Sequence, residues 1–188
     1  MTSTDSKKVQ KNNNWRGLLF WIIIALLFRW QAVEPRWIPS GSMIPTLQIQ
    51  DRILIEKITP RLNQKLHKHS KRNTIVIFKP PKSLTETSYS DGSALIKRVV
   101  GLPGDRIEVS KGKLYRNNNE INEPWIKEDI QYEMEPINVP EGSLWVLGDN
   151  RNNSLDSHLW GPLPEKNLIG TAFIRYWPIK AMGPIWFP

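Results

Sequence analysis

The 188-residue sequence contains no cysteine. This absence excludes a disulfide framework, a thiol nucleophile and a cysteine-ligated metal site. Acidic residues are also comparatively few, with 18 Asp and Glu against 26 Lys and Arg, so the net charge is +8 and the pI is about 9.8. A balance of this kind favours an anionic partner, either a nucleic acid or a lipid surface.

The sequence lacks a long apolar run. Gly17–Phe28 is uncharged but only twelve residues long, and as a helix it would rise about 18 Å, short of a hydrocarbon core of roughly 30 Å. The interfacial tryptophans and the snorkelling side chains of Arg16 and Arg29 extend it to nineteen residues, Trp15–Val33. We therefore predict one transmembrane helix at residues 17–33, rather than a cleaved signal peptide, because no small-residue cleavage site follows the run. A buried core helix is the alternative.

Basic residues gather at two places in the chain. Lys7, Lys8, Lys11 and Arg16 precede the apolar run, which predicts a cytoplasmic N-terminus at residues 1–16 and the rest of the chain beyond Val33 across the membrane. The position of this cluster beside an apolar segment favours a lipid bilayer, rather than nucleic acid, as a partner. The second run, Lys65–Arg72, is typical of a solvated loop.

Beyond Val33 the chain is typical of a β protein. Fifteen prolines, eleven glycines and repeated turn signals separate short β-branched or alternating runs, without a long helical period. The expected strands are Arg52–Ile58, Thr74–Phe78, Ala94–Val100, Arg106–Val109, Leu144–Leu147 and Thr171–Trp177. This spacing predicts a mainly β fold, an antiparallel barrel or sandwich. The polar segments Thr59–Asn73 and Pro80–Ser93 are expected to be loops.

Three short motifs stand out, and each is commonplace alone. The first, Ile38-Pro39-Ser40-Gly41-Ser42-Met43, places two serines in a rigid, exposed turn. The second, Lys97-Arg98-Val99-Val100-Gly101, puts a lysine on a strand face between Leu95 and Val99, with Arg98 on the opposite face. A lysine between apolar neighbours is unusual, although an edge-strand lysine that discourages aggregation is the ordinary explanation. The third is a dense polar loop from Gly148 to Gly161, which could equally be a hairpin loop.

Together, in this order and after one N-terminal apolar segment, the motifs resemble the type I signal peptidases. The resemblance extends from about Trp37 to Trp177. It implies an endopeptidase that removes signal peptides from exported preproteins after small residues at −1 and −3. Ser42 would be the nucleophile and neutral Lys97 the general base, with an acyl-enzyme intermediate and no cofactor or metal.

The chemistry of the two side chains agrees with these roles. A serine hydroxyl needs a neighbouring base to remove its proton. Lysine, with an ordinary pKa of about 10.4, is a base only when neutral. Lowering that pKa to near 7 corresponds to about 4 kcal/mol, which burial in apolar surroundings can supply. Leu95 and Val99 are expected to provide these surroundings for Lys97.

The resemblance also assigns supporting residues. Ser154 would hydrogen-bond the neutral amine, and the oxyanion would be held by the Ser42 N–H and the Ser40 hydroxyl. Asp149, Arg151 and Asp156 would form a polar network around them. The sequence departs from the common family pattern at His158, where Arg is frequent, and at Asn152, where Asp is common, and both departures weaken the network assignment.

Substrate binding and domain organisation follow from the same resemblance. The resemblance implies six substrate-binding residues: Ile38, Pro39, Met43, Leu47, Leu95 and Ile96. All except Leu95 lie at or beside positions that line shallow apolar pockets in the family, and Leu95 and Ile96 could pair with an extended substrate as an added strand. The catalytic β domain is expected at residues 34–105 and 143–188, with a small hairpin-like cap at 106–142. We expect a monomer whose catalytic domain faces the periplasm, the cell exterior or a thylakoid lumen.

Three other functions explain the sequence less well. A conventional triad of a serine with His158 and Asp156 is crowded, because the two residues and Ser154 alternate along one short stretch. A self-cleaving repressor, which also uses Ser and Lys, would carry a DNA-binding head and an Ala-Gly scissile bond, and neither is present. A membrane-tethered basic binding module would leave the three motifs without an explanation.

Overall fold

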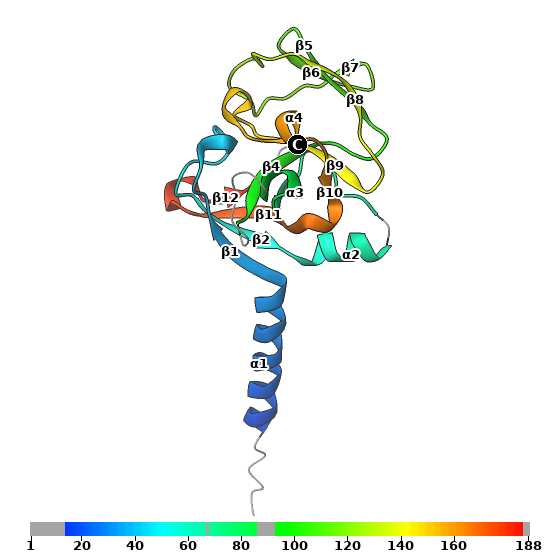
Figure 1. Ribbon diagram of the computed structural model, residues 1–188. Helices are drawn as coiled ribbons and strands as arrows, with labels where there is room; N and C mark the ends of the chain where they lie inside the picture. The colour runs from blue at the N-terminus through cyan, green and yellow to red at the C-terminus, as the bar shows by residue number, and fades with distance from the viewer. Residues whose placement is uncertain (1–13, 67, 86–92, 186–188) are drawn as a thin grey trace, which may run out of the picture. The chain divides into compact units, whose positions relative to one another are not determined.

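The computed structural model describes residues 14–66, 68–85 and 93–185. The chain divides into two compact units, Met1–Ala32 and Val33–Pro188. The first unit is described as one helix, α1 (Asn14–Ala32), and the second contains all of the strands (Figure 1).

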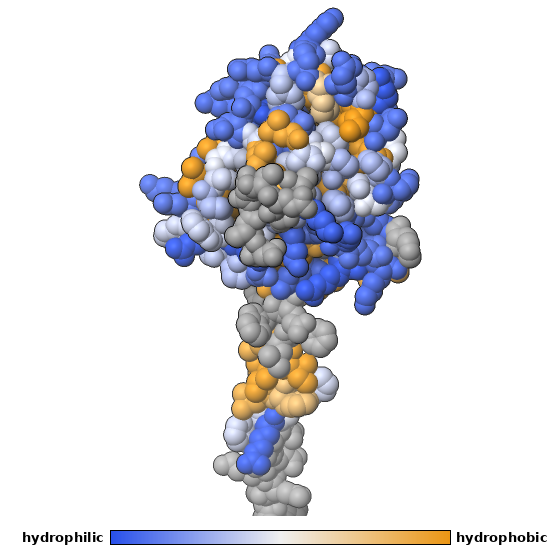
Figure 2. Space-filling model, viewed as in Figure 1, coloured by the Kyte–Doolittle hydropathy of each residue, from blue (hydrophilic) through white to orange (hydrophobic). Residues whose placement is uncertain are grey.

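Helix α1 forms where the sequence predicts a transmembrane segment. Figure 2 shows apolar residues gathered along it, with hydrophilic residues below them. None of the helices in the described ranges combines the length and the hydropathy needed to cross a membrane. The predicted span at 17–33 is therefore not supported. The orientation that depended on it stays a prediction, and residues 1–13 lie outside the described part of the chain.

The second unit is built on an eight-stranded antiparallel sheet. Its order is β1-β2-β11-β3-β4-β9-β10, with β12 paired to β11. The strands are β1 (Val33–Trp37), β2 (Arg52–Glu56), β3 (Ile75–Phe78), β4 (Leu95–Gly101), β9 (Ser143–Leu147), β10 (Leu163–Pro164), β11 (Leu168–Trp177) and β12 (Gly183–Pro184). The predicted mainly β, antiparallel class is confirmed.

A second antiparallel sheet occupies the region where a hairpin-like cap is predicted. It has four strands in the order β7-β6-β5-β8: β5 (Arg106–Ser110), β6 (Lys113–Arg116), β7 (Asn119–Glu120) and β8 (Met134–Asn138). The cap is thus a four-stranded sheet, larger than the predicted hairpin. Its buried Ile107 and Leu114 pack with Trp145 and Leu147 of β9, so one apolar cluster joins the two sheets.

Short helices interrupt the strands, including in segments expected to be loops. They are α2 (Ile58–Leu66), α3 (Lys82–Thr85) and α4 (Ser157–Trp160), with 3₁₀ turns η1 (Gly41–Met43), η2 (Arg151–Asn153), η3 (Glu165–Asn167) and η4 (Ile179–Ala181). Helix α2 corrects the prediction of a loop at Thr59–Asn73. Its first turn is stabilised by the Glu56 carboxylate, which accepts hydrogen bonds from the N–H groups of Ile58 and Thr59 at 3.1 and 2.8 Å.

The apolar core holds the η1 turn against the main sheet. Met43 and Leu47 are fully buried and pack in one cluster with Ile38, Ile53 and residues of β3 and β4. A turn with a buried apolar side chain on each side, Ile38 before it and Met43 at its end, has little freedom to move. The core therefore determines where Ser42, between Ile38 and Met43, lies.

Candidate active site

Ser42 lies in the η1 turn, next to the polar loop that follows β9. Its side chain is buried. The N–H of Asn150 donates to the Ser42 carbonyl at 3.0 Å, and the Asn150 Nδ2 donates to the Gly41 carbonyl at 3.1 Å. Asn150 thus holds the serine-bearing turn through two carbonyl groups of its backbone, which leaves the Ser42 hydroxyl available for other contacts.

Lys97 approaches Ser42 from the middle of β4. Its Nζ donates to the Ser42 Oγ at 2.9 Å and to the Ile96 carbonyl at 2.9 Å, and the residue is 3% exposed. Burial lowers the pKa of Lys97 from 10.5 to about 8, although the charges of Asp156 and Asp149 act in the opposite direction. A hydroxyl and an amine in hydrogen-bond contact, with the amine partly neutral near neutral pH, have the geometry of a nucleophile and its base.

The two serines expected to assist are both near this pair. The Ser40 Oγ lies 3.3 Å from the Ser42 Oγ. The buried Ser154 Oγ has no hydrogen-bond partner among the described residues, so the expected bond to the Lys97 amine is absent. The Lys97 Nζ instead donates to the Ser42 Oγ and to the carbonyl of Ile96, the preceding residue of its own strand.

Gly148, which begins the third motif, is a site residue that the sequence reasoning did not identify. A Cβ at this position would lie 2.5 Å from the Ser42 carbonyl oxygen and would also collide with the Ser154 Oγ. Its N–H donates to Asp156 Oδ2 at 2.8 Å, and its carbonyl accepts from Arg151 Nε at 2.9 Å. Only glycine lets β9 pass this close to the serine turn, and its place directly before Asp149 in a turn motif was the available signal.

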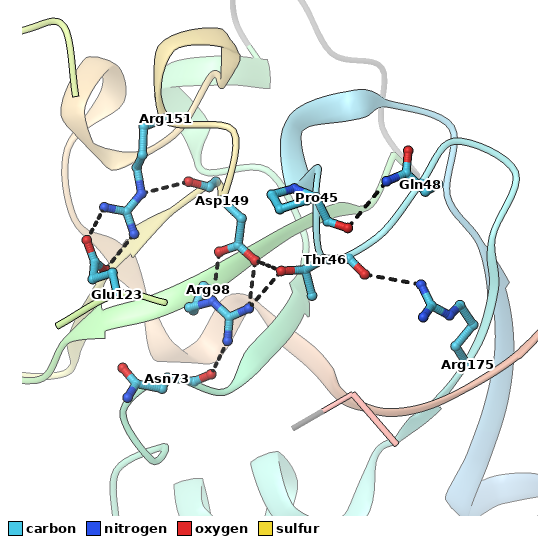
Figure 3. A network of polar contacts seen from close by, with 10 residues as sticks. Pro45, Thr46, Gln48, Asn73, Arg98, Glu123, Asp149, Arg151 and Arg175 are labelled. Atoms are coloured by element: carbon cyan, nitrogen blue, oxygen red, sulfur yellow. Dashed lines mark hydrogen bonds and ion pairs between the residues drawn. The ribbon is translucent and has the colours of Figure 1, made fainter. Parts of the chain in front are cut away.

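Asp149 forms a buried ion pair with Arg98 (Figure 3). The Arg98 Nε and Nη2 donate to the two carboxylate oxygens at 2.7 and 2.6 Å, and Thr46 Oγ1 donates to Oδ2 at 2.5 Å. The guanidinium also donates to the Asn73 carbonyl at 2.8 Å and lies 4.6 Å from the Trp125 ring centroid. Arg98 and Thr46 were not predicted, although strand alternation placed Arg98 on the face opposite Lys97.

Arg151 forms its ion pair with Glu123, rather than with Asp149 or Asp156 of its own loop. Its Nη1 and Nη2 donate to the Glu123 carboxylate at 2.5 and 2.6 Å, and both side chains are buried. Glu123 follows β7 in the smaller sheet, and its carboxylate faces the Arg151 guanidinium in Figure 3. Asn152 joins the same region, because its side chain accepts from the Gln131 N–H at 2.8 Å and donates to the Asp129 carbonyl at 3.0 Å. These contacts fix the polar loop to the cap.

Asp156 is fully buried and pairs with His158. The His158 Nδ1 lies 2.7 Å from Asp156 Oδ1, and the His158 N–H donates to the same oxygen at 3.2 Å. The imidazole stacks on Tyr132 with ring centroids 4.2 Å apart. Histidine therefore occupies a position bonded to the aspartate, despite its departure from the common pattern.

A small apolar cavity lies beside β1 and β4. Its volume is about 180 Å³, and its walls include Ile38, Pro39, Leu95 and Ile96, four of the six residues predicted to bind substrate. The other two, Met43 and Leu47, belong to the buried core instead. β4 pairs with β9 only from Arg98 onward. Among the described strands, residues 95–97 are therefore paired with β3 alone and are open on the β9 side.

The Asp and Glu residues of the site are engaged in ion pairs and backbone contacts. Within residues 14–66, 68–85 and 93–185, no three His, Asp or Glu side chains are grouped so as to hold a metal ion.

Comparisons with known proteins agree over most of the chain. The family model described as "Signal peptidase, peptidase S26" matches residues 13–177. A probable signal peptidase I-2 of Synechocystis sp. is 42% identical over 96% of this chain and 82% of its own length. A probable thylakoidal processing peptidase 2 of Arabidopsis thaliana is 48% identical over 87% of this chain and 43% of its own length. The signal peptidase I U of Bacillus subtilis is 34% identical over 94% of both chains.

Proposed function

This chain belongs to the signal peptidase family, peptidase S26, and from that premise we propose that it removes signal peptides from exported preproteins. The proposal is supported by relatives in two lineages that are 42% and 34% identical over nearly the whole chain and are named as signal peptidases. The reaction is hydrolysis of the peptide bond between the signal peptide and the mature protein.

Ser42 is the proposed nucleophile and Lys97 its base. Neutral Lys97 accepts the Oγ proton while Oγ bonds to the carbonyl carbon of the scissile peptide. The resulting ammonium then donates its proton to the departing amine of the mature protein, which leaves the signal peptide as an ester on Ser42. Lys97 next removes a proton from a water molecule, and attack of that water on the ester releases the signal peptide and restores the hydroxyl.

The proposed oxyanion site consists of the Ser42 N–H and the Ser40 hydroxyl. During attack, negative charge develops on the carbonyl oxygen of the scissile peptide, next to Ser42 Oγ. The Ser40 Oγ lies 3.3 Å from the Ser42 Oγ, so it is close to this charge. A donor positioned in advance stabilises this charge without reorganising during the reaction. The ion pairs of Asp149 and Arg151, and the contact of Asp156 with the Gly148 N–H, act as positioning elements around it.

Substrate recognition is proposed to use the small cavity and the open stretch of β4. A cavity of about 180 Å³ is below the roughly 300–1,000 Å³ of common ligand pockets, so it suits the small side chains expected at −1 and −3. An extended peptide can pair with residues 95–97 on the side that β9 leaves open. Its scissile carbonyl would then pass close to Ser42, which contacts Lys97 of the same strand.

The contacts of the histidine disfavour a conventional triad. His158 is bonded to Asp156 and stacked on Tyr132, whereas the Ser42 hydroxyl contacts Lys97 and Ser40. The observation that best supports a Ser42–Lys97 dyad is thus the 2.9 Å distance between the Lys97 Nζ and the Ser42 Oγ.

The test is the cleavage of a preprotein in detergent by Ser42→Ala and Lys97→Ala. We expect each variant to lose activity by at least about 10³-fold while its thermal unfolding remains cooperative. Ser110→Ala and Lys166→Ala, outside the site, are matched controls and should cleave like the parent. Near-parental turnover by Lys97→Ala would contradict the dyad.

A further inference from the structure

Helix α2 turns its apolar side chains away from the protein. Ile58, Leu62 and Leu66 are spaced four residues apart and are 55, 50 and 52% exposed, whereas Pro60 is buried. At 100° per residue, these three side chains cover one face and Pro60 lies on the opposite one. A surface helix normally directs its apolar stripe towards the core. The reversed orientation of α2 leaves a continuous apolar stripe in contact with solvent.

The orientation of α2 is fixed by contacts on its inner side. The Gln64 Nε2 donates to the Glu165 carbonyl at 2.9 Å, and the His69 Nδ1 lies 2.9 Å from the Glu165 carboxylate. Asn63 Nδ2 donates to the His69 carbonyl at 3.2 Å, which holds the chain after the helix against it. Figure 1 shows α2 at the edge of the Val33–Pro188 unit. These contacts keep the inner side of α2 against the protein and leave the apolar stripe outward.

The segment around the stripe carries positive charge alone. Residues 57–73 contain six Lys and Arg and no Asp or Glu. Lys57 and Arg72 are paired with Glu34 and Asp105. The remaining four are exposed and form no ion pair with any residue that the structure describes: Arg61, Lys65, Lys68 and Lys71. On the helical wheel, Arg61 and Lys65 border the apolar stripe directly.

We propose that α2 and the basic segment after it form a docking site for an anionic lipid surface. The helix lies parallel to that surface, with Ile58, Leu62 and Leu66 at the boundary between headgroups and acyl chains and the cations among the headgroup phosphates. Charge complementarity determines the choice of an anionic surface, and the aliphatic stripe determines the choice of lipid. This site is separate from the dyad and its cavity, so it extends the proposed peptidase function without depending on it.

Two other occupants fit the surface less well. Proteins that bind single-stranded nucleic acid stack bases on aromatic side chains, and α2 has none. A stable interface with a second copy buries roughly 1,200–2,000 Å², which three aliphatic side chains on a nine-residue helix cannot supply. A lipid surface needs neither aromatic platforms nor shape complementarity.

The test uses the absence of cysteine from the chain. Thr59→Cys, an exposed position beside the stripe, is labelled in the full-length protein with an environment-sensitive fluorophore, and Asn122→Cys in the smaller sheet region serves as the matched control. Both proteins are reconstituted into phosphatidylcholine vesicles with or without phosphatidylglycerol. We expect brominated lipid to quench the label at residue 59 in the anionic vesicles, and to quench the label at residue 122 in neither.

Two variants separate the contributions of charge and apolar surface. Replacing Arg61, Lys65, Lys68 and Lys71 by Gln is expected to lower lipid contact roughly fivefold per charge removed. Replacing Ile58, Leu62 and Leu66 by Ser is expected to abolish quenching. Both sets of positions are exposed, and cleavage of a short soluble peptide should remain unchanged, which separates this proposal from the peptidase function.

Three outcomes would overturn the proposal. Equal fluorescence and quenching in the anionic and neutral vesicles would exclude an anionic lipid site. Protection of the residue 59 label by a single-stranded DNA oligonucleotide, without lipid quenching, would identify a nucleic-acid surface instead. A change that depends on protein concentration in the absence of vesicles would identify contact between two copies of the chain.

Discussion

Lys97 and Arg98 are adjacent cations on β4 that are both buried, yet they have opposite surroundings. Arg98 is bound by both oxygens of Asp149, by the Asn73 carbonyl and by the face of Trp125. The Lys97 amine, in the part of the chain that the structure describes, hydrogen-bonds to a hydroxyl and a carbonyl and to no carboxylate. A carboxylate in direct contact favours the charged form of a base, whereas burial with neutral partners disfavours it. The two faces of one strand thus separate a cation that holds the structure together from one suited to lose its proton.

The largest expected effect is that of Lys97→Arg, which gives the Lys97 face of β4 an arginine like the one at Arg98 on the opposite face. In Lys97→Arg the positive charge is kept, but a guanidinium is not deprotonated in proteins and cannot act as the base. We expect a loss of cleavage as large as that of Lys97→Ala, at least about 10³-fold, measured as kcat on a preprotein. Retained activity in Lys97→Arg would show that the charge, rather than the neutral amine, matters at this position.

The Arg98 face of β4 is tested by removing the Asp149 carboxylate that pairs with it. Asp149→Asn removes the charge of the carboxylate that pairs with the buried Arg98, and breaking a buried ion pair in this way costs about 3–5 kcal/mol of unfolding free energy. Denaturant-induced unfolding measures this loss. Glu108→Gln breaks the partly exposed pair with Arg106 and should cost less than about 1 kcal/mol. Equal losses in the two variants would contradict the structural role assigned to the Arg98–Asp149 pair.

Gly148 connects the two faces, because it lies beside Ser42 and directly before Asp149. Gly148→Ala places a methyl group 2.5 Å from the Ser42 carbonyl oxygen, so the serine turn or β9 must move. We expect a loss of about 1–3 kcal/mol in stability together with a lower kcat. Gly104→Ala does not serve as a control, because Gly104 has a positive φ of 81°. Gly183→Ala, with open space around its Cβ position, should leave both measurements unchanged.

Local pattern was sufficient to predict the faces of β4 but not the partners on them. Alternation along a strand places Lys97 and Arg98 on opposite sides, and the structure has them there. The Arg98–Asp149 pair joins residues 51 positions apart, and the Arg151–Glu123 pair crosses to the smaller sheet. Such pairings depend on how the sheets pack, and the period of either strand carries no information about them.

Two further differences have a similar origin. The Ser154 hydroxyl was expected to bind the Lys97 amine, but the amine donates to the Ile96 carbonyl and Ser154 Oγ has no partner among the described residues. Which acceptor a buried amine reaches depends on packing in the folded site, which a sequence motif does not contain. The segment of helix α2 was expected to be a loop because it is polar and shows no clear period. Its N-terminal stabilisation by Glu56 and its contacts with Glu165 are tertiary features.

The smallest expected effect is a shift in the pH dependence of cleavage when a charge near Lys97 is removed. With a pKa of about 8, the neutral fraction rises roughly tenfold per pH unit below that value and levels off above it, so kcat should follow the same curve. Asp156 raises the pKa of Lys97, and Asp156→Asn removes its charge but keeps an oxygen acceptor. The midpoint of the kcat–pH profile should therefore move to lower pH. Glu128→Gln, an exposed acid, is the control and should leave it unchanged. A midpoint that moves to higher pH in Asp156→Asn would show that the titrating group is not a lysine held neutral by burial.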